Sequence, residues 1–444
     1  MMKVPEEVLT ILGQLNTAGH SAYVVGGCVR DSLLGLIPGD WDICTSASPE
    51  QMKECFSNYH VIETGLKHGT LTVRVNHQSY EITTFRTDGN YTDCRHPEKV
   101  TFVSDIKDDL ARRDFTVNAM AYHPDKGLMD LFGGLNDLSD KKLRCVGDSK
   151  TRFTEDALRI MRGLRFAATY GFSIATETEK AMFQTKELLL KIAPERIIVE
   201  LKKLLLGEYA ENILLSYRKI FGEIVPELVP MFDFDQKNPH HLHDVWTHTV
   251  KSVVVSKKDI MIRLAVLFHD IGKPKTFLID ENGIGHFHAH ALRSADITQT
   301  ILKRLKLDNY TVDTVTELVK YHDAQIEATE KSVKRWLNKI GPEQLERLLF
   351  VKEADAKSTV YAEEKLKIIR EIRSIFSKVM EENACFALKD LEISGSDLIL
   401  LGIPEGKLIG DVLKKLLSLV IDGEIPNQKE ILLSVAQKEY KNIR

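Results

Sequence analysis

Two different hydrophobic periods divide the chain. Within the first 140 residues or so, short apolar runs alternate with helical segments, which predicts a mixed α/β head. The predicted strands span 22–25, 41–44, 71–75, 80–85 and 119–122. From about residue 148 onward, apolar residues recur at helical spacing and few β-branched runs remain. We therefore expect an α+β protein in which a mixed head precedes a larger, elongated all-α body.

Length and composition indicate several domains. A chain of 444 residues that is 43% hydrophobic can bury more than one core. The segments 232–239 and 381–384 are typical of linkers. We expect a head, a helical neck, a third domain rich in histidine, and a helical tail; their ranges are 1–145, 146–232, 240–360 and 380–444.

Charge and hydropathy narrow the class of partner. A formal net charge of −4 argues against a protein that coats nucleic acid by bulk electrostatics, so an RNA partner has to be met by local patches and by shape. No apolar run is long enough to span a membrane, and the start lacks a secretory hydrophobic region, so we expect no membrane partner and a cytoplasmic location. The six cysteines show no metal-ligand spacing and are expected to be reduced.

The segment 23–42 carries the most specific chemical signal. A predicted strand ends in Gly26 and Gly27, which let the backbone approach phosphate oxygens, and the segment 33–35 is typical of a helix start. Asp40 and Asp42 are two residues apart in the next predicted strand, so their carboxylates should point to the same face. Two convergent carboxylates beside a phosphate cradle predict a Mg²⁺ site.

With these and other blocks, the sequence resembles the nucleotidyltransferases of the DNA polymerase β superfamily. Within it, the chain is similar to the class II bacterial family of CCA-adding tRNA nucleotidyltransferases and poly(A) polymerases. The resemblance is dense over about the first 205 residues, and its blocks are 23–31, 40–42, 112–119, 130–135, 154–166 and 194–197. It implies a polymerase β-like head that adds CCA to tRNA 3′ ends from CTP and ATP and releases pyrophosphate. It also implies Mg²⁺ as cofactor and no DNA partner.

The resemblance and the residues together predict site roles in the head. Asp40 and Asp42 are the expected catalytic metal ligands, and Glu81 is a candidate third carboxylate or an ordinary surface residue of a strand. Asp114 and Asn118 could contact ribose or be purely structural. The residues expected to hold the triphosphate are Gly26, Gly27, Arg30 and Arg113.

An arginine-rich row follows in the neck. Asp156, Arg159, Arg162 and Arg165 recur every three residues and so trace one inclined row on a predicted helix. The resemblance assigns the first two to the nucleobase and the last two to the phosphates. Cytosine and adenine both offer an amino donor beside a ring-nitrogen acceptor, which a carboxylate and a guanidinium match. Guanine and uracil lack this pattern, and each pairing that is lost should cost about 1–3 kcal/mol of binding free energy.

A polar segment at 85–99 is bounded by predicted strands. Taken alone, it is typical of an ordinary connecting loop. In the family, it resembles a loop that CCA-adding and A-adding enzymes possess and CC-adding enzymes lack. The sequence therefore favours an enzyme that adds the terminal A.

A second constellation lies between residues 243 and 355 and resembles an HD domain, a helical metal-binding phosphohydrolase fold. The expected ligands are His248, His269, Asp270 and Asp355, with His290 and His322 as candidates for a second metal. Imidazole and carboxylate together suit Mn, Ni, Co or Fe. Hydrolase activity stays an open alternative to a structural role.

The tail contains glycine-rich turns at 393–410, which the resemblance implies contact tRNA and which could equally close a helical hairpin. Rival functions remain open on the sequence alone. They are an A-adding enzyme that needs a CC-adding partner, a poly(A) polymerase, an HD phosphohydrolase with a vestigial head, and a non-catalytic RNA-binding protein. The poly(A) polymerases of the family are typically basic and lack these histidines, so the pI of about 6.5 counts against that reading.

Overall fold

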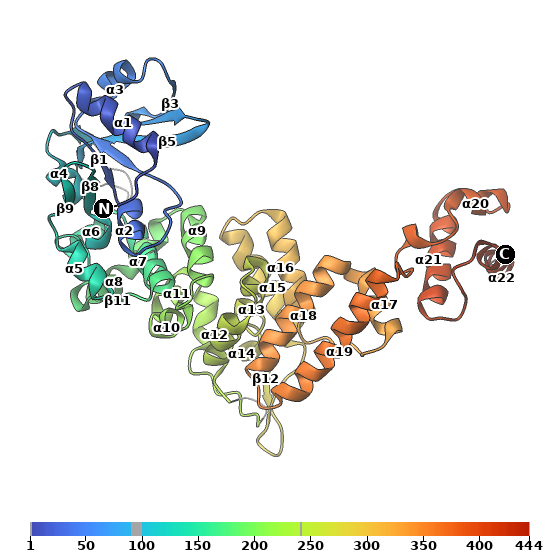
Figure 1. The fold of residues 1–444 in the computed structure, drawn as a ribbon. Helices are drawn as coiled ribbons and strands as arrows, with labels where there is room; N and C mark the ends of the chain where they lie inside the picture. The colour runs from blue at the N-terminus through green and yellow to red at the C-terminus, as the bar shows by residue number, and fades with distance from the viewer. Residues whose placement is uncertain (1, 90–99, 240–241, 444) are drawn as a thin grey trace. The chain divides into compact units, whose positions relative to one another are not determined.

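The computed structural model describes residues 2–89, 100–239 and 242–443. It divides into two compact units, Met1–Pro226 and Glu227–Arg444. Each unit has its own arrangement of helices, and the large sheet lies in the first (Figure 1). Among the described residues, no helix is both long and apolar enough to cross a bilayer. The predicted α+β class is confirmed.

A seven-stranded sheet in the order β3-β4-β5-β2-β1-β8-β9 organises the head. Its strands are β1 (Ala22–Val25), β2 (Ile43–Thr45), β3 (His60–Gly65), β4 (Thr70–Val75), β5 (Gln78–Thr84), β8 (Met120–His123) and β9 (Gly127–Asp130). The pairing of β2 with β5 is parallel, whereas the others are antiparallel. The interior strand β1, which lies between β2 and β8, is buried along its whole length, as its apolar sequence predicts.

Helices cover the sheet because its strands alternate their side chains between two faces. Tyr23 and Val25 of β1 share an apolar cluster with Ile106 and Leu110 of α4 (Ile106–Ala111). The helices α1 (Glu6–Thr17) and α3 (Pro49–Cys55) contact β1 and β4. α3 begins at a capping box between Ser48 and Gln51, a motif whose loss costs about 1 kcal/mol.

Shorter elements complete the head. The strands β6 (Arg86–Asp88) and β7 (Val100–Phe102) pair antiparallel and flank the predicted loop, of which residues 90–99 lie outside the described residues. The others are η1 (Leu66–His68), η2 (Thr116–Asn118), α2 (Gly27–Leu33), α5 (Gly134–Ser139) and β10 (Lys142–Leu143), which pairs with β11 (Ser173–Ile174).

The rest of the first unit is helical, as its period predicts. The helices are α6 (Ser149–Glu155), α7 (Leu158–Tyr170), α8 (Thr176–Thr185), η3 (Lys186–Lys191), α9 (Pro194–Leu205), α10 (Ala210–Ser216) and α11 (Arg218–Ile224), and η4 (Pro226–Met231) follows. α7 packs along α9. Pro194 at the first helical position pre-sets the backbone angle there, which fixes where α9 starts.

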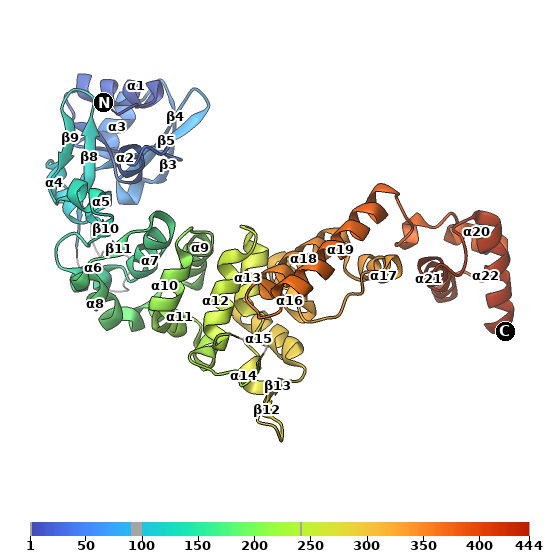
Figure 2. The same ribbon diagram turned by 60° about the horizontal axis from the view of Figure 1, so that its bottom comes forward.

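The second unit is built around α13 (Ile260–Phe268), which is buried over most of its length. It packs against α12 (Val245–Val255), α16 (Asn309–Tyr321) and α18 (Pro342–Lys357). Its elements up to residue 381 are α12 (Val245–Val255), α14 (Lys273–Thr276), β12 (Phe277–Ile279), β13 (Gly285–Phe287), α15 (His290–Arg304), α16 (Asn309–Tyr321), α17 (Glu330–Ile340), α18 (Pro342–Lys357) and α19 (Ala362–Glu381). Figure 2 shows these helices from a second direction. Asp259 accepts two backbone N–H bonds at the start of α13 and so fixes where this helix begins.

The end of the chain has its own apolar cluster, which includes Leu398, Leu416 and Leu432. These residues come from α20 (Gly395–Leu400), α21 (Lys407–Ile421) and α22 (Lys429–Ile443), which follow η5 (Leu388–Asp390). A cluster formed only by residues after 384 indicates a tail with its own small core.

Candidate active site and a buried histidine cluster

The end of β1 brings the backbone close to a cavity. Gly26 has a φ of 77°, and a Cβ at this position would lie 2.8 Å from the Arg113 Nη1 atom. Glycine is the residue that accepts this backbone angle without strain. α2 begins directly afterwards at Gly27 and ends at Leu33. The expected helix start at 33–35 is therefore wrong, because this segment is where the helix ends.

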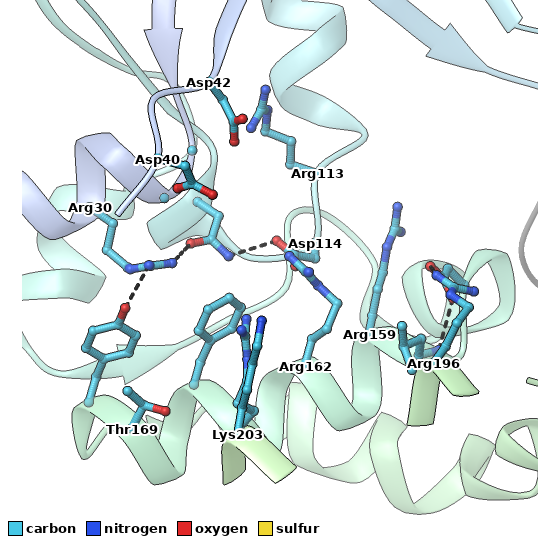
Figure 3. A pocket seen from close by; sticks show the side chains of 18 of the residues that line it. Arg30, Asp40, Asp42, Arg113, Asp114, Arg159, Arg162, Thr169, Arg196 and Lys203 are labelled. Atoms are coloured by element: carbon cyan, nitrogen blue, oxygen red, sulfur yellow. Dashed lines mark hydrogen bonds and ion pairs between the residues drawn. The ribbon is translucent and has the colours of Figure 1, made fainter. Parts of the chain in front are cut away.

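Asp40 and Asp42 lie in the loop before β2 and not within a strand, which corrects the prediction of a strand at 41–44. Pairing with β1 begins only at Ile43. The position of Asp42 is nevertheless fixed, because its carbonyl accepts the Val25 N–H at 3.0 Å. The Cys28 thiol lies 4.0 Å from the same carbonyl, and burial raises the pKa of this thiol to about 12. Both carboxylates line the cavity beside the two glycines (Figure 3).

The electrostatics of the aspartates fit a divalent cation. The pKa of Asp42 is raised, first by burial within the surrounding protein and then by the negative charge of Asp40. Glu81 raises the pKa further, and the parallel pairing of Ile43 with Ile82 explains why Glu81 is near. Carboxylates that disfavour one another's charge are stabilised by a hard cation, and Mg²⁺ prefers such oxygen ligands.

Arg113 reaches the same region from the segment after α4. It contacts Asp109 at 3.2 Å, and Arg112 contacts the other oxygen of Asp109 at 2.6 Å. Burial alone raises the pKa of Asp109, but the two guanidinium groups outweigh it and lower the pKa below its ordinary value. Arg113 is thereby held near Asp42, where its positive charge offsets part of the rise in the pKa of Asp42.

Asp156 does not lie on the helix that carries the three arginines. α6 ends at Glu155, Asp156 has an extended backbone, and α7 starts at Leu158, so the predicted single row is broken at its first member. Asp156 accepts the Leu158 N–H at 3.0 Å and the Arg196 guanidinium at 3.0 Å. Its carboxylate is thus oriented from α7 and α9 together.

Arg159, Arg162 and Arg165 do share one face of α7, and all three line the cavity. Their partners differ. Arg159 is bound by Glu155 at 2.7 Å and by the Arg112 carbonyl at 2.9 Å.

Arg162 pairs with Asp114 at 2.8 Å, and Arg165 pairs with Glu200 at 3.0 Å. Burial raises the pKa of Asp114, but Arg162 and a hydrogen bond from Asn118 lower it to about 2. Asp114 therefore stays ionised and fixes Arg162.

Arg30 is buried and almost fully bonded within the protein. Its Nη1 donates to the Asn118 side chain at 2.5 Å, and its Nη2 donates to the Tyr170 hydroxyl at 2.8 Å. Its Nε donates to Asp31 at 2.9 Å, and the Tyr170 hydroxyl donates to the same carboxylate oxygen at 2.9 Å. The guanidinium also lies 4.7 Å from the Tyr170 ring centre. Arg30 thus joins α2 of the head to the end of α7.

These side chains meet in one cavity of about 560 Å³. Every residue predicted for the head site lines it except Glu81. Sequence reasoning missed other polar side chains there, namely Arg112, Thr169, Tyr170, Arg196 and Lys203. The block 194–197 carries part of the family resemblance, but the sequence alone assigned it no role in the site. Positions 196, 200 and 203 are spaced to share one face of a helix, and this spacing is the signal that could have placed Arg196 and Lys203 on the cavity.

The second unit contains a buried cluster of histidines and carboxylates. His248 comes from α12, His269 and Asp270 follow α13, His290 starts α15 and His322 directly follows α16. Candidate ligand atoms of His248, His269 and Asp270 lie within 4.8 Å of one another, and so do those of Asp270, His290 and His322. Asp355 on α18 is 3.0 Å from His248 Nε2. The predicted residues are therefore brought together.

The hydrogen bonds of these histidines leave one ring nitrogen of each directed at the cluster. The Nδ1 atoms of His269, His290 and His322 lie 2.7, 2.9 and 2.7 Å from backbone carbonyls, to which they donate. In a neutral ring, the Nε2 atoms of His290 and His322 are then acceptors, whereas Asp270 raises the pKa of His269 to about 10 and lies 3.2 Å from its Nε2. The Nε2 atoms of His290 and His322 face each other at 3.1 Å. Two facing lone pairs at this distance are stabilised by a cation, and imidazole ligands suit a transition metal.

Family models match three stretches of the chain. Residues 22–144 match the poly A polymerase head domain. Residues 171–232 match the RNA and SrmB-binding site of polymerase A, and residues 287–436 match domain 2 of tRNA nucleotidyltransferases. The matched head contains the glycines and the aspartate pair described above.

Curated relatives extend the similarity to the whole chain. The CCA-adding enzyme of Leuconostoc mesenteroides is 34% identical over 99% of this chain and 98% of its own length. The CCA-adding enzyme of Enterococcus faecalis is 31% identical over 98% of this chain and 96% of its own length. The CCA-adding enzyme of Leuconostoc citreum is 51% identical over 48% of this chain and 53% of its own length.

Solved structures agree. The Bacillus stearothermophilus CCA-adding enzyme in complex with CTP has a TM-score of 0.72 at 28% identity and covers 98% of both chains. A Thermotoga maritima CCA-adding enzyme complexed with tRNA, at 20% identity and a TM-score of 0.62, has the same fold. Because the full-length relatives exceed 30% identity over nearly both entire chains, this chain belongs to the CCA-adding enzyme family of tRNA nucleotidyltransferases.

Proposed function

We propose that this chain adds CMP, CMP and then AMP to tRNA 3′ ends from CTP and ATP, and that the cavity of the first unit is the site of transfer. One observation carries the proposal: the aspartate pair and the Asp156/Arg159 pair line the same cavity. The first pair suits metal-assisted phosphoryl transfer, and the second suits recognition of a nucleobase edge. The membership of the family supports the same reaction.

Asp40 and Asp42 would hold Mg²⁺, with Glu81 near enough to assist. When bound, the metal would neutralise charge on the α-phosphate and on the departing pyrophosphate while the tRNA 3′ hydroxyl attacks in line. The protein's own contribution is positioning. The glycine turn brings the backbone to the phosphates, Arg113 and Arg162 are held by Asp109 and Asp114, and the excess of cations offsets the charge of a triphosphate.

Base selection rests on two side chains that are fixed before a nucleotide arrives. Asp156 would accept from the exocyclic amino group of cytosine or adenine, and Arg159 would donate to the adjacent ring nitrogen. Glu155 and the Arg112 carbonyl hold Arg159, so its donors cannot turn to suit uracil or guanine. The same pair can therefore select C and A without a nucleic-acid template.

The decisive experiment supplies purified protein with tRNA ending at the discriminator base, at C or at CC, together with each labelled nucleotide. The product lengths distinguish complete CCA addition from A-only addition and from poly(A) synthesis. Asp42→Ala should lower CMP and AMP incorporation alike by about 10²-fold or more, the scale of losing a major electrostatic stabiliser. Asp140→Ala, an exposed aspartate that does not line the cavity, is the control. Wild-type rates in the Asp42 variant would overturn the metal assignment.

We also propose that the histidine cluster holds a transition metal and supports a phosphohydrolase activity, as the resemblance to an HD domain implies. The facing Nε2 atoms of His290 and His322 favour this second function. A metal there would supply a water of lowered pKa, and the chain's histidines and carboxylates would orient it. A 2′,3′-cyclic phosphate, as found on damaged RNA ends, is the substrate class we would test first.

This second function is tested with the double variant His269→Ala and Asp270→Ala. It should lose bound metal and any Ni²⁺- or Mn²⁺-dependent hydrolysis while CCA addition continues. The matched control is His286→Ala with Asp280→Ala, a half-buried pair 2.8 Å apart at the β12–β13 pairing and outside the cluster. Metal bound without turnover by the wild type would leave only a structural role.

Two further proposals concern location and the tail. A cytoplasmic location stays a prediction. We assign a tRNA contact to the segment between α20 and α21, where Gly402 and Gly406 both have positive φ and open space around the Cα position. The Gly402 N–H is itself donated to the Ile399 carbonyl at 2.9 Å, so what supports the proposal is the room for a close approach of a phosphate to the backbone.

A further inference from the structure

Lys203 differs from the other cations of the head cavity, because it has no carboxylate partner among the residues that the structure describes. Each of the seven arginines that line the cavity is ion-paired. The pairs are Arg30 with Asp31, Arg112 and Arg113 with Asp109, Arg159 with Glu155, Arg162 with Asp114, Arg165 with Glu200, and Arg196 with Asp156. Within the part of the chain that the structure describes, the Lys203 ammonium makes no ion pair or hydrogen bond.

The position of Lys203 follows from its helix. Residues 196, 200 and 203 are spaced to share one face of α9, and the first two contact Asp156 and Arg165 of the neighbouring segment. Between Arg196 and Lys203 the helix rises by about 10 Å. Lys203 therefore lies away from the nucleobase pair. Figure 3 shows it on the side of the cavity where Thr169 and Arg30 lie.

Arg30, one of the cations expected to hold the triphosphate, has little hydrogen-bonding capacity left. Arg30 donates from Nε, Nη1 and Nη2 to Asp31, Asn118 and Tyr170, so most of its five N–H donors are already used. Its charge is also offset by Asp31 at 2.8 Å. At this end of the cavity, Lys203 carries a positive charge that no carboxylate among the described residues offsets.

We propose that Lys203 binds the terminal phosphates of the incoming nucleoside triphosphate and of the pyrophosphate product. This inference rests on the proposed function of the cavity. An ammonium group on a flexible stem is a point charge that can follow the phosphates from substrate to product. Because Lys203 lies away from Asp156, its contact does not depend on the base. It therefore acts on CTP and ATP alike.

The test measures equilibrium binding of CTP, ATP and inorganic tripolyphosphate to the full chain without tRNA. Lys203→Met should weaken all three by about two- to fivefold, the range for one charge contact at an exposed side chain. It should also flatten the salt dependence of binding, because one screened contact is gone. Lys203→Arg should restore most of the affinity. Lys202→Met, the adjacent lysine that does not line the cavity, should match the wild type.

The outcomes separate this inference from the function on which it rests. Wild-type affinity for all three ligands in Lys203→Met overturns the inference alone, as does a raised KM for tRNA with unchanged nucleotide binding. A loss confined to one nucleotide also overturns it, since a base contact would then be involved. A wild-type chain that neither binds CTP and ATP nor adds CMP overturns the proposed function itself.

Discussion

Replacement of Arg196 by methionine should weaken base selection without abolishing transfer. In the structure, Arg196 donates to one oxygen of Asp156 at 3.0 Å, and the Leu158 N–H donates to the other oxygen at 3.0 Å. Arg196→Met removes the first contact and keeps most of the side-chain volume. The carboxylate is then held from one side only, and it can rotate away from the exocyclic amino group that it is proposed to recognise.

The magnitude follows from the exposure of the pair. The side chains of Arg196 and Asp156 are 26% and 19% exposed. Fully exposed pairs contribute about 0.2–1 kcal/mol, whereas hydrogen bonds to charged groups inside a protein contribute about 1.5–3 kcal/mol. A partly buried pair lies between, at about 1–2 kcal/mol. The ratio of kcat/KM for CTP over UTP should therefore fall by about 5- to 30-fold.

The assay is single-nucleotide incorporation on tRNA that lacks CCA, with each of the four nucleotides in turn. Arg144→Met is the matched control, because Arg144 pairs with Asp137 at 3.1 Å but does not line the cavity. Unchanged selectivity in the Arg196 variant, or an equal loss in the Arg144 variant, would refute the reasoning. A loss of kcat with selectivity intact would assign Arg196 to the phosphates instead.

Two more predictions concern the metal and the loop. Because burial and Asp40 raise the pKa of Asp42, protons should compete with Mg²⁺ at higher pH than for an ordinary aspartate. The Mg²⁺ concentration for half-maximal rate should thus rise as the pH is lowered from about 8 to about 5, and a constant requirement would contradict this prediction. Deletion of residues 88–95, most of which lie outside the described residues, should preserve CC addition and abolish terminal A addition; normal CCA completion by the shortened chain would reduce the segment to a connector.

The sequence predicted the chemistry of the cavity better than its local geometry. Alternation and apolar runs located β1 correctly and the other predicted strands within a few residues, because buried strands must be apolar. The predicted strand at 41–44 begins two residues too early. The alternation of side chains is compatible with a strand that includes Trp41 and Asp42, and only the pairing with β1 decides that β2 starts at Ile43. The prediction of a single helical row from Asp156 to Arg165 is wrong at Asp156, because a spacing of three residues does not reveal a break between two helices.

Ion pairs across the first unit were the least predictable feature. Nothing local to Arg30 indicates that Tyr170, 140 residues later, accepts its hydrogen bond. The same holds for Arg162 with Asp114 and for Arg196 with Asp156, since each pair depends on how α7 packs against α9 and the head. The histidine cluster was predictable because histidine–aspartate adjacency is an uncommon local signal, whereas its carbonyl partners depend on helix ends that the sequence locates only roughly.

The thiol of Cys28 bears on how the cavity withstands oxidants. Peroxides and alkylating reagents attack the thiolate, and a thiol with a pKa of about 12 is ionised in roughly one molecule in 10⁵ at neutral pH. Cys28 is only 1% exposed, so reagents also lack access to it. A residue that touches the backbone of Asp42 is thus chemically inert. Nucleotide transfer should survive oxidative stress that inactivates enzymes with reactive cysteines near their catalytic carboxylates.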